Sequence, residues 1–176
     1  MANWHKRFMD LADHVATWSK DRSTQVGAVI ASPDSAFFSV GYNGFPRGAN
    51  DDVETRHERP EKYFWAEHAE RNAIYNCARS GHKLLGYRIY VPWFPCMDCA
   101  RAIVQSGIST VIYKKLDSKD GLWLRWKDSC ARSMELFLET NVDMLVYDPR
   151  TEEVAPVYWS VNLEDNLLCL KETCEP

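Results

Sequence analysis

The fold is decided by residues 87–113, which read Tyr-Arg-Ile-Tyr-Val-Pro-Trp-Phe-Pro-Cys-Met-Asp-Cys-Ala-Arg-Ala-Ile-Val-Gln-Ser-Gly-Ile-Ser-Thr-Val-Ile-Tyr. Two short apolar runs, 87–91 and 110–113, have the length and composition of buried strands. Between them, Ala100, Ile103 and Val104 recur at helical spacing, and a glycine follows as a stop signal. The stretch therefore predicts a strand, a helix over about 95–106, and a second strand.

The alternation extends in both directions along the chain. We expect further helices over 4–19, 67–80 and 122–139, and further strands over 25–31, 36–42 and 142–147. A hairpin followed by alternating elements implies a mixed sheet with helices on both faces. The helix over 122–139 makes the last two strands parallel, because a crossover of that length fits a right-handed unit. The fold class is α/β, a three-layer α/β/α sandwich with a five-stranded mixed sheet.

Length and composition set the broad class of protein. The chain has 176 residues, of which 45% are hydrophobic and 26% charged, as in soluble globular domains. We expect one domain over 1–150 and a tail over 151–176, in which 162–170 form a short helix packed on the domain or a neighbour. No apolar run approaches the ~18 residues that would span a membrane, and the N-terminus lacks a signal-like apolar region. A cytoplasmic protein without a membrane partner is expected.

The charge balance limits the class of partner. The formal net charge is −4, whereas proteins that grip long nucleic acids usually carry a basic excess. A nucleic acid polymer is therefore not expected as a partner. A small nucleotide held by a local basic cluster remains compatible with this charge.

The six cysteines do not suggest a disulfide framework, because the chain is long and has no secretory signal. They are Cys77, Cys96, Cys99, Cys130, Cys169 and Cys174. Cys77 and Cys130 lie on the apolar stripes of predicted helices and are interpreted as core residues. Cys169 and Cys174 lie in a weakly patterned segment and are interpreted as packing or surface thiols.

The remaining pair belongs to a metal-binding pattern. Cys96 and Cys99 stand at i and i+3 at the start of a helix, where both side chains can reach one ion and the helix dipole favours thiolates. His68 begins another predicted helix. Two thiolates and an imidazole suit one Zn²⁺ in a tetrahedral site whose fourth position holds water. A closed structural site would need a fourth protein ligand, and no second tight pair offers one, so an open catalytic site is favoured.

Glu70 is the candidate acid/base residue of this site. It lies two positions after His68, or roughly 200° around a helix, so the two side chains are poorly placed to bind the same ion. The carboxylate is better placed to exchange a proton with a water on the metal.

At these residues the chain resembles a known family. His68-Ala69-Glu70 with Pro95-Cys96-Met97-Asp98-Cys99 resembles the signature of zinc-dependent nucleoside and nucleotide deaminases. Residues 19–30, the glycine-rich stretch 41–48 with Asp51-Asp52, and Lys62-Tyr63 are similar to deoxycytidylate deaminases. The resemblance covers about 4–115 and implies a cytidine deaminase-like fold with one catalytic zinc ion per chain.

The resemblance implies hydrolysis of deoxycytidylate (dCMP) to dUMP and ammonia. Glu70 would take a proton from water, protonate N3 of the base and assist the leaving amine. Ala69 matches the residue whose backbone holds the base edge, and Asn43 matches the sugar contact, although Asn43 also suits a turn. A deaminase of 5-substituted dCMP or another nucleotide or base stays open, because Trp93 and Phe94 replace smaller or more polar residues of many relatives. A catalytically silent zinc-containing nucleotide-binding protein also stays open.

The remaining site candidates follow from the same resemblance. The phosphate needs cationic or polar partners, and the leading candidates are Arg22, Lys20 and Gln25. Tyr113 could line the pocket or pack in the core. Many family members are homohexamers regulated by dCTP and dTTP at a site built partly from the glycine-rich loop. The matching positions are Gly41, Tyr42, Gly44 and Arg47, so these effectors and a homo-oligomer are expected.

Overall fold

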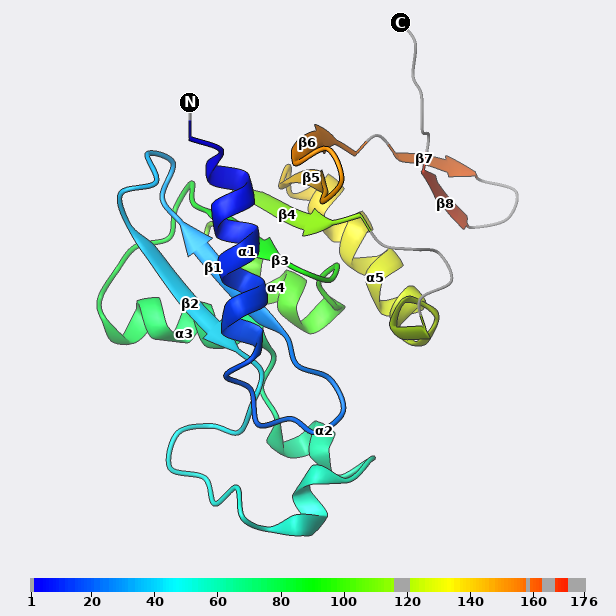
Figure 1. Ribbon diagram of the computed structural model, residues 1–176. Helices are drawn as coiled ribbons and strands as arrows, with labels where there is room; N and C mark the ends of the chain where they lie inside the picture. Colours follow the sequence, from blue (N-terminus) through cyan, green and yellow to red (C-terminus); the bar gives the residue numbers. More distant parts are fainter. Residues whose placement is uncertain (1, 116–120, 158, 163–166, 171–176) are drawn as a thin grey trace, which may run out of the picture.

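A computed structural model describes residues 2–115, 121–157, 159–162 and 167–170, and it contains a mixed sheet in the order β2-β1-β3-β4-β5-β6 (Figure 1). The strands of this sheet are β1 (Gly27–Ala31), β2 (Phe38–Tyr42), β3 (Arg88–Val91), β4 (Thr110–Lys114), β5 (Asp143–Asp148) and β6 (Glu153–Pro156). β1 pairs antiparallel with both β2 and β3, whereas β3, β4 and β5 run parallel. The predicted hairpin and the predicted parallel pair are both confirmed.

Helices cover both faces of the sheet. They are α1 (Trp4–Ala16), α2 (Lys62–Trp65), α3 (Ala69–Arg79), α4 (Met97–Gln105) and α5 (Gly121–Glu139), with a short 3₁₀ helix η1 (Glu54–His57). α1 lies on one face, and α3, α4 and α5 lie on the other (Figure 1). The predicted three-layer α/β/α sandwich is confirmed.

The last strand of the sheet corrects the expected strand number. β6 pairs antiparallel with β5, so the sheet has six strands where the sequence pattern predicts five. The segment 153–156 reads Glu-Val-Ala-Pro, which is too short and too polar to show a clear alternation. Its proline is tolerated because β6 is an edge strand of the sheet. The predicted tail after residue 150 thus begins by adding a strand to the domain.

The helix predicted over 162–170 is wrong for the described part of that segment. β7 (Trp159–Asn162) and β8 (Leu167–Leu170) pair antiparallel as a separate two-stranded sheet. The leucines and charged residues of this segment have good intrinsic helix propensity. Propensity is a weak prior, and pairing between two segments of backbone overrides it here. The side chains of Cys169 and Cys174 lie outside the described residues.

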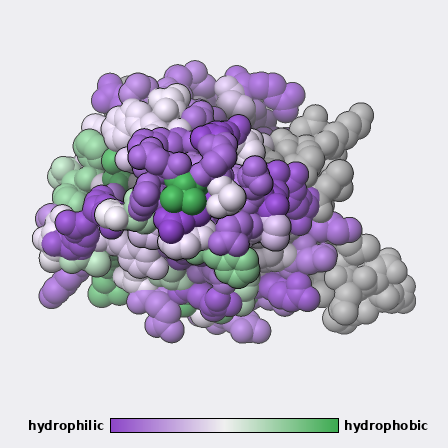
Figure 2. All heavy atoms as spheres, turned by 90° about the horizontal axis from the view of Figure 1, so that it is seen from below, coloured by the Kyte–Doolittle hydropathy of each residue, from purple (hydrophilic) through white to green (hydrophobic). Residues whose placement is uncertain are grey.

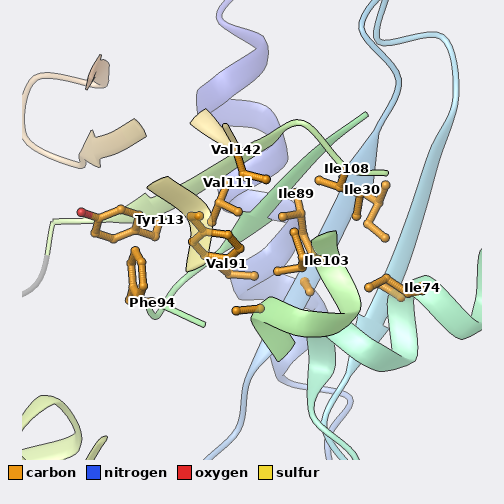
Figure 3. Packing of buried hydrophobic residues seen from close by; sticks show 14 of the residues in the cluster. Ile30, Ile74, Ile89, Val91, Phe94, Ile103, Ile108, Val111, Tyr113 and Val142 are labelled. Atoms are coloured by element: carbon orange, nitrogen blue, oxygen red, sulfur yellow. The ribbon is translucent and has the colours of Figure 1, made fainter. Parts of the chain in front are cut away.

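The core divides into two layers by the period-two alternation of the strands. On β1, Ala28 and Ile30 pack toward α3 and α4, whereas Val29 and Ala31 pack toward α1. Ile89 follows the same rule on β3, and Figure 3 shows it among the isoleucines and valines of the layer that faces α3 and α4. Both faces of the central strands are buried, which explains why these strands read as continuous apolar runs.

Two glycines allow helices to approach the hairpin closely. A Cβ on Gly27 would lie 2.1 Å from the carbonyl oxygen of Ala12 in α1. A Cβ on Gly41 would lie 2.3 Å from the backbone nitrogen of Ala73 in α3. No side chain fits at such distances, so packing alone requires glycine at both positions.

The segment between β2 and α3 extends below the sheet (Figure 1). The sequence suggests an irregular polar stretch here, and the structure adds the short helices η1 and α2 within it. Seen from below, this face of the molecule is mostly hydrophilic, with small separate hydrophobic patches (Figure 2). Among the described helices, none is long and apolar enough to cross a membrane.

Candidate metal centre and active site

Two helix N-termini bring the predicted metal ligands together. His68 is the N-cap of α3 and Cys96 is the N-cap of α4, and both have extended backbone angles. Cys99 lies one turn into α4. An N-cap side chain naturally folds back over the first turn of its helix, so Cys96 lies near Cys99. The parallel order of β3 and β4 in turn positions α4 beside α3.

The three ligand atoms fit one tetrahedral zinc ion. His68 Nδ1 lies 3.4 Å from Cys96 Sγ and 3.5 Å from Cys99 Sγ. Zinc bonds of ordinary length at tetrahedral angles separate a nitrogen and a sulfur ligand by about 3.5 Å. Within the described ranges, this is the single group of three or more such ligands close enough to share an ion. Three protein ligands leave the fourth position for water or substrate.

The pKa values of the two thiols are shifted in opposite directions. The hydrogen bond with Cys99 and the neighbouring His68 lower the pKa of Cys96 to about 4, against the effect of burial. The Cys96 thiolate and burial both raise the pKa of Cys99. A divalent cation supplies the positive charge that stabilises both groups as thiolates. The donor set is therefore suited to Zn²⁺ in its charge as well as its geometry.

Glu70 lies beside the metal ligands without joining them. Its side chain sits on the first turn of α3 and is only 6% exposed. Burial raises the pKa of this carboxyl above its ordinary value, although His68 opposes the effect. A carboxyl group that takes and releases protons nearer neutral pH is suited to general acid/base work. The structure thus separates Glu70 from the ligand set, as its spacing predicts.

Arg71 is a charged neighbour that the sequence pattern did not single out. Its guanidinium donates two hydrogen bonds to Glu67, at 2.7 and 2.8 Å. Its Nη1 also lies 3.9 Å from Cys99 Sγ. A cation at this distance offsets part of the negative charge of the thiolates. The Glu67–Arg71 spacing of four residues on one helix was the available sequence signal.

A cavity of about 270 Å³ opens beside the metal site. α5 forms part of its wall through Trp126, Ser129 and Cys130. The ring of Trp126 stands edge-on to the His68 imidazole, with 5.8 Å between centroids. Trp93 and Phe94 line the cavity as well, in agreement with their expected place beside the base. Trp93, Phe94 and Trp126 therefore offer aromatic surface that a small planar ring could contact.

Asn43 and Ala69 also line this cavity. The side chain of Asn43 is buried and fixed at both ends: its Nδ2 donates to the Thr24 carbonyl at 2.9 Å, and its Oδ1 accepts from Val26 N at 2.8 Å. Asn43 therefore has a structural role in joining β2 to the segment before β1. Because Asn43 also lies in the cavity wall, it can contact a substrate while keeping these structural hydrogen bonds.

Tyr113 does not line the cavity, which supports packing over the pocket role suggested for it. Its ring meets Phe94 edge to face with 4.8 Å between centroids (Figure 3). Burial raises the pKa of Tyr113 well above its ordinary value. Phe94 is the residue of this pair that faces the cavity.

The three residues proposed for the phosphate do not reach the metal cavity. Lys20 pairs with Asp51 at 2.6 Å, and Arg22 pairs with Glu54 through two hydrogen bonds. Gln25 Nε2 donates to the Ser19 carbonyl at 2.7 Å. None of the three lines the metal cavity. The sequence places these residues near the first strand but does not show that their side chains turn away from the metal site.

Lys20 and Arg22 instead line a second cavity of about 240 Å³. Tyr42, Gly44 and Arg47, three of the four residues suggested for effector binding, line it too. Gly41 does not line this cavity, and its close contact with α3 gives a packing reason for the glycine instead. The glycine-rich stretch therefore forms a pocket of its own beside the metal cavity.

The two cavities share a buried ion pair. Lys62 Nζ lies 2.8 Å from Asp21 Oδ2, with the two side chains 10% and 12% exposed, and both residues line both cavities. Burial alone would raise the pKa of Asp21, but hydrogen bonds from Lys62 and from the backbone of residues 23 and 24 lower it to about 2. The pairing joins residues 41 positions apart, so local sequence gives no sign of it.

Comparisons with known proteins agree with this site. The family model described as the cytidine and deoxycytidylate deaminase zinc-binding region matches residues 2–115. A protein from Aliivibrio fischeri named "Uncharacterized deaminase in luxG 3'region" is 42% identical over 82% of this chain and 93% of its own length. The human deoxycytidylate deaminase is 32% identical over 90% of this chain and 88% of its own.

Solved structures agree on the fold. The crystal structure of the dCMP deaminase from cyanophage S-TIM5, in complex with dCMP and dUMP, superposes with a TM-score of 0.63. It covers 80% of this chain and 94% of its own, at 23% identity. The likeness supports the mixed sheet and its flanking helices as the shared architecture.

Proposed function

The chain belongs to the zinc-binding cytidine and deoxycytidylate deaminase family, and on that premise we propose that it hydrolyses dCMP to dUMP and ammonia. The observation that carries the proposal is the His68–Cys96–Cys99 ligand group, of which His68 and Cys96 line one cavity together with the buried Glu70. The names of the relatives support a deoxynucleotide substrate, since the human and mouse proteins are both deoxycytidylate deaminases.

The chemistry is divided between the metal and the chain. Zinc held by His68, Cys96 and Cys99 supplies a Lewis acid that makes water a better nucleophile near neutral pH. Glu70 accepts a proton from the attacking water and delivers it to N3 of cytosine. It then takes the remaining proton of the hydroxyl group on C4 and passes it to the amino group, which leaves as ammonia while the C4 carbonyl forms. Its burial supports this shuttle, because a carboxyl whose pKa is raised gives up and regains a proton with less penalty at neutral pH.

Residues of the cavity wall would orient the substrate. The backbone of Ala69 is proposed to hold the polar edge of the base, and Asn43 to contact the sugar, since both line the cavity. Trp93 and Phe94 would enclose the ring from the segment before α4.

The proposal is tested by turnover of dCMP with the zinc-loaded protein. Loss of the cytosine absorbance should accompany release of ammonia, at about one zinc ion per chain. Glu70→Gln should keep the zinc and lower kcat by about 10²–10⁴-fold, the usual contribution of a general acid/base. Glu135→Gln, a substitution on the exposed part of α5, is the matched control and should keep full activity. Unchanged turnover in Glu70→Gln would contradict the proposed proton carrier.

A second candidate substrate is a dCMP that carries a substituent at C5. The specific observation in its favour is the aromatic pair Trp93 and Phe94 in the cavity wall, which sets the space around the base. Parallel assays with dCMP, 5-methyl-dCMP, dCTP and deoxycytidine decide between these substrates. Failure on the whole panel with zinc present would favour a silent nucleotide-binding protein.

Regulation, assembly and location form a further part of the proposal. We propose dCTP and dTTP as effectors in the second cavity, whose lining includes Tyr42, Gly44 and Arg47, and a homohexamer as the assembly. Opposite effects of the two nucleotides on turnover, and the mass in solution, test these points. The cytoplasm is proposed as the location, supported by the free thiols of Cys77, Cys96, Cys99 and Cys130, which suit a reducing compartment.

A further inference from the structure

We infer that Arg59, held by Tyr63 and Ser23 at the edge of the metal cavity, binds the 5′ phosphate of the substrate. The inference rests on the proposed function, since it assigns a subsite for a nucleoside monophosphate to the same cavity. It replaces Lys20, Arg22 and Gln25, the candidates that precede the first strand in sequence. Those side chains are engaged elsewhere, as their contacts with Asp51, Glu54 and Ser19 show.

The first argument is the charge balance of the cavity wall. Lys62 is neutralised by Asp21, and Arg71 is neutralised by Glu67. Arg59 and Arg125 also line the cavity, and among the described residues neither guanidinium lies within 4.0 Å of a carboxylate. Of these two, Arg59 is the one that described neighbours hold in place, through Tyr63 and Ser23. A phosphate monoester carries up to two negative charges at neutral pH and needs such a cation. Arg59 therefore offers a positive charge that the fold has left for a ligand.

The second argument is that neutral groups hold the guanidinium in place. Arg59 Nε donates to the Tyr63 hydroxyl at 3.0 Å, and Nη2 donates to Ser23 Oγ at 3.3 Å. These bonds fix the orientation of the guanidinium and leave three of its five N–H groups available. The Tyr63 hydroxyl accepts from Arg59, so its own proton can be donated to a phosphate oxygen. A fixed fork of donors is the geometry that binds phosphate in two places at once.

The third argument is that this arrangement is anchored in the protein. Ser23 Oγ accepts from Lys62 Nζ at 2.7 Å and donates to Asp21 Oδ1 at 2.9 Å. The buried Asp21–Lys62 pair thus holds the serine that holds the arginine. Lys62 acts here as a positioning residue, because its charge is already matched by Asp21. Preorganisation of this kind lowers the entropy that a flexible arginine would lose on binding.

The test is a binding titration with dUMP and with deoxyuridine, which differ only by the phosphate. Neither ligand is turned over, so the measurement does not depend on catalysis. The wild-type protein should bind dUMP more tightly, and Arg59→Gln should weaken dUMP binding by about 10- to 100-fold without changing the affinity for deoxyuridine. Arg59→Lys should recover part of the loss, because the charge returns without the fork. Tyr63→Phe should cost less, about 3- to 10-fold.

The matched control is Arg79→Gln, the same change at an exposed position that lines neither cavity. It should leave both affinities unchanged. An unaltered dUMP affinity in Arg59→Gln, or an equal loss for deoxyuridine, would overturn the inference. So would a loss of dUMP affinity in Arg22→Gln with Arg59→Gln at the wild-type value.

The outcome is distinguishable from failure of the proposed function. A protein that binds dUMP through Arg59 but does not deaminate dCMP would contradict only the proposed reaction. A protein that deaminates dCMP with the same KM in Arg59→Gln as in wild type would contradict only the phosphate subsite.

Discussion

The two cavities are both lined by charged residues but differ in how deeply those charges are buried. The metal cavity contains the buried Glu70, whose pKa is raised by burial, and it shares the buried Lys62–Asp21 pair with the second cavity. In the second cavity the lining residues Lys20 and Arg22 belong to exposed pairs, Lys20–Asp51 and Arg22–Glu54. Buried charges interact strongly and demand partners, whereas exposed charges are screened by water. The first cavity therefore holds a buried acid suited to proton transfer, whereas the second adds exposed ion pairs to the buried pair that both cavities share.

The largest expected effect comes from removing a metal ligand in the first cavity. Cys99→Ala should lower the zinc content from one ion per chain to near zero and abolish turnover, because two remaining ligands bind zinc weakly. The zinc content is measured by elemental analysis of the purified protein. Cys77→Ala is the control, since Cys77 is a buried free thiol of α3 away from the ligand set. Full zinc occupancy in Cys99→Ala would refute the ligand assignment.

The next effect tests the ion pair that the two cavities share. Lys62→Met should lower the free energy of unfolding by about 3–5 kcal/mol, because Asp21 is left buried without its counter-charge. Lys20→Met removes a lysine from the exposed pair and should leave the unfolding midpoint unchanged. Urea unfolding of both variants gives the comparison. Equal losses of unfolding free energy in the two variants would show that burial does not make the Lys62–Asp21 pair stronger than the exposed Lys20–Asp51 pair.

A smaller effect should follow from the cation beside the thiolates. Arg71→Gln should weaken zinc binding by about 10- to 100-fold, the usual size for a residue behind the ligands. The reason is that Arg71 lies 3.9 Å from Cys99 Sγ and offsets its charge. Competition with a chromophoric chelator measures the affinity. Arg101→Gln, an exposed neighbour that pairs with Asp98, should bind zinc like the wild type.

The smallest effect is a dependence of stability on acid. Because Asp21 has a pKa of about 2 in the folded protein and 3.8 ordinarily, its contribution is fully present above about pH 4 and is lost as pH falls through about 2. The contribution is about 2 kcal/mol. Unfolding free energies measured between pH 5 and pH 2.5 should fall more steeply in wild type than in Lys62→Met. Parallel curves would contradict the depressed pKa.

Much of the fold and the metal site followed from local patterns. The apolar runs before and after residues 95–106 predicted two buried strands, and the Cys96–Cys99 spacing predicted a shared ion. Both are confirmed in outline because period, capping and ligand spacing act over a few residues. The predictions were wrong where pairing between separate strands decides the structure. These places are β6, which adds a sixth strand, and the β7–β8 pair, which replaces the predicted helix.

The sequence by itself indicated the His68–Cys96–Cys99 group, the position of Glu70 outside that group and the α/β class, because each depends on the spacing of residues within one element or at its ends. Only the tertiary structure decided which charges near the cavities are already paired within the protein. Arg22 and Arg59 are both exposed arginines near the site in sequence terms, yet Glu54 neutralises one and hydroxyl groups hold the other. The physical reason is that a charge is available to a ligand only when no neighbour across the fold has already matched it, and such neighbours are set by packing.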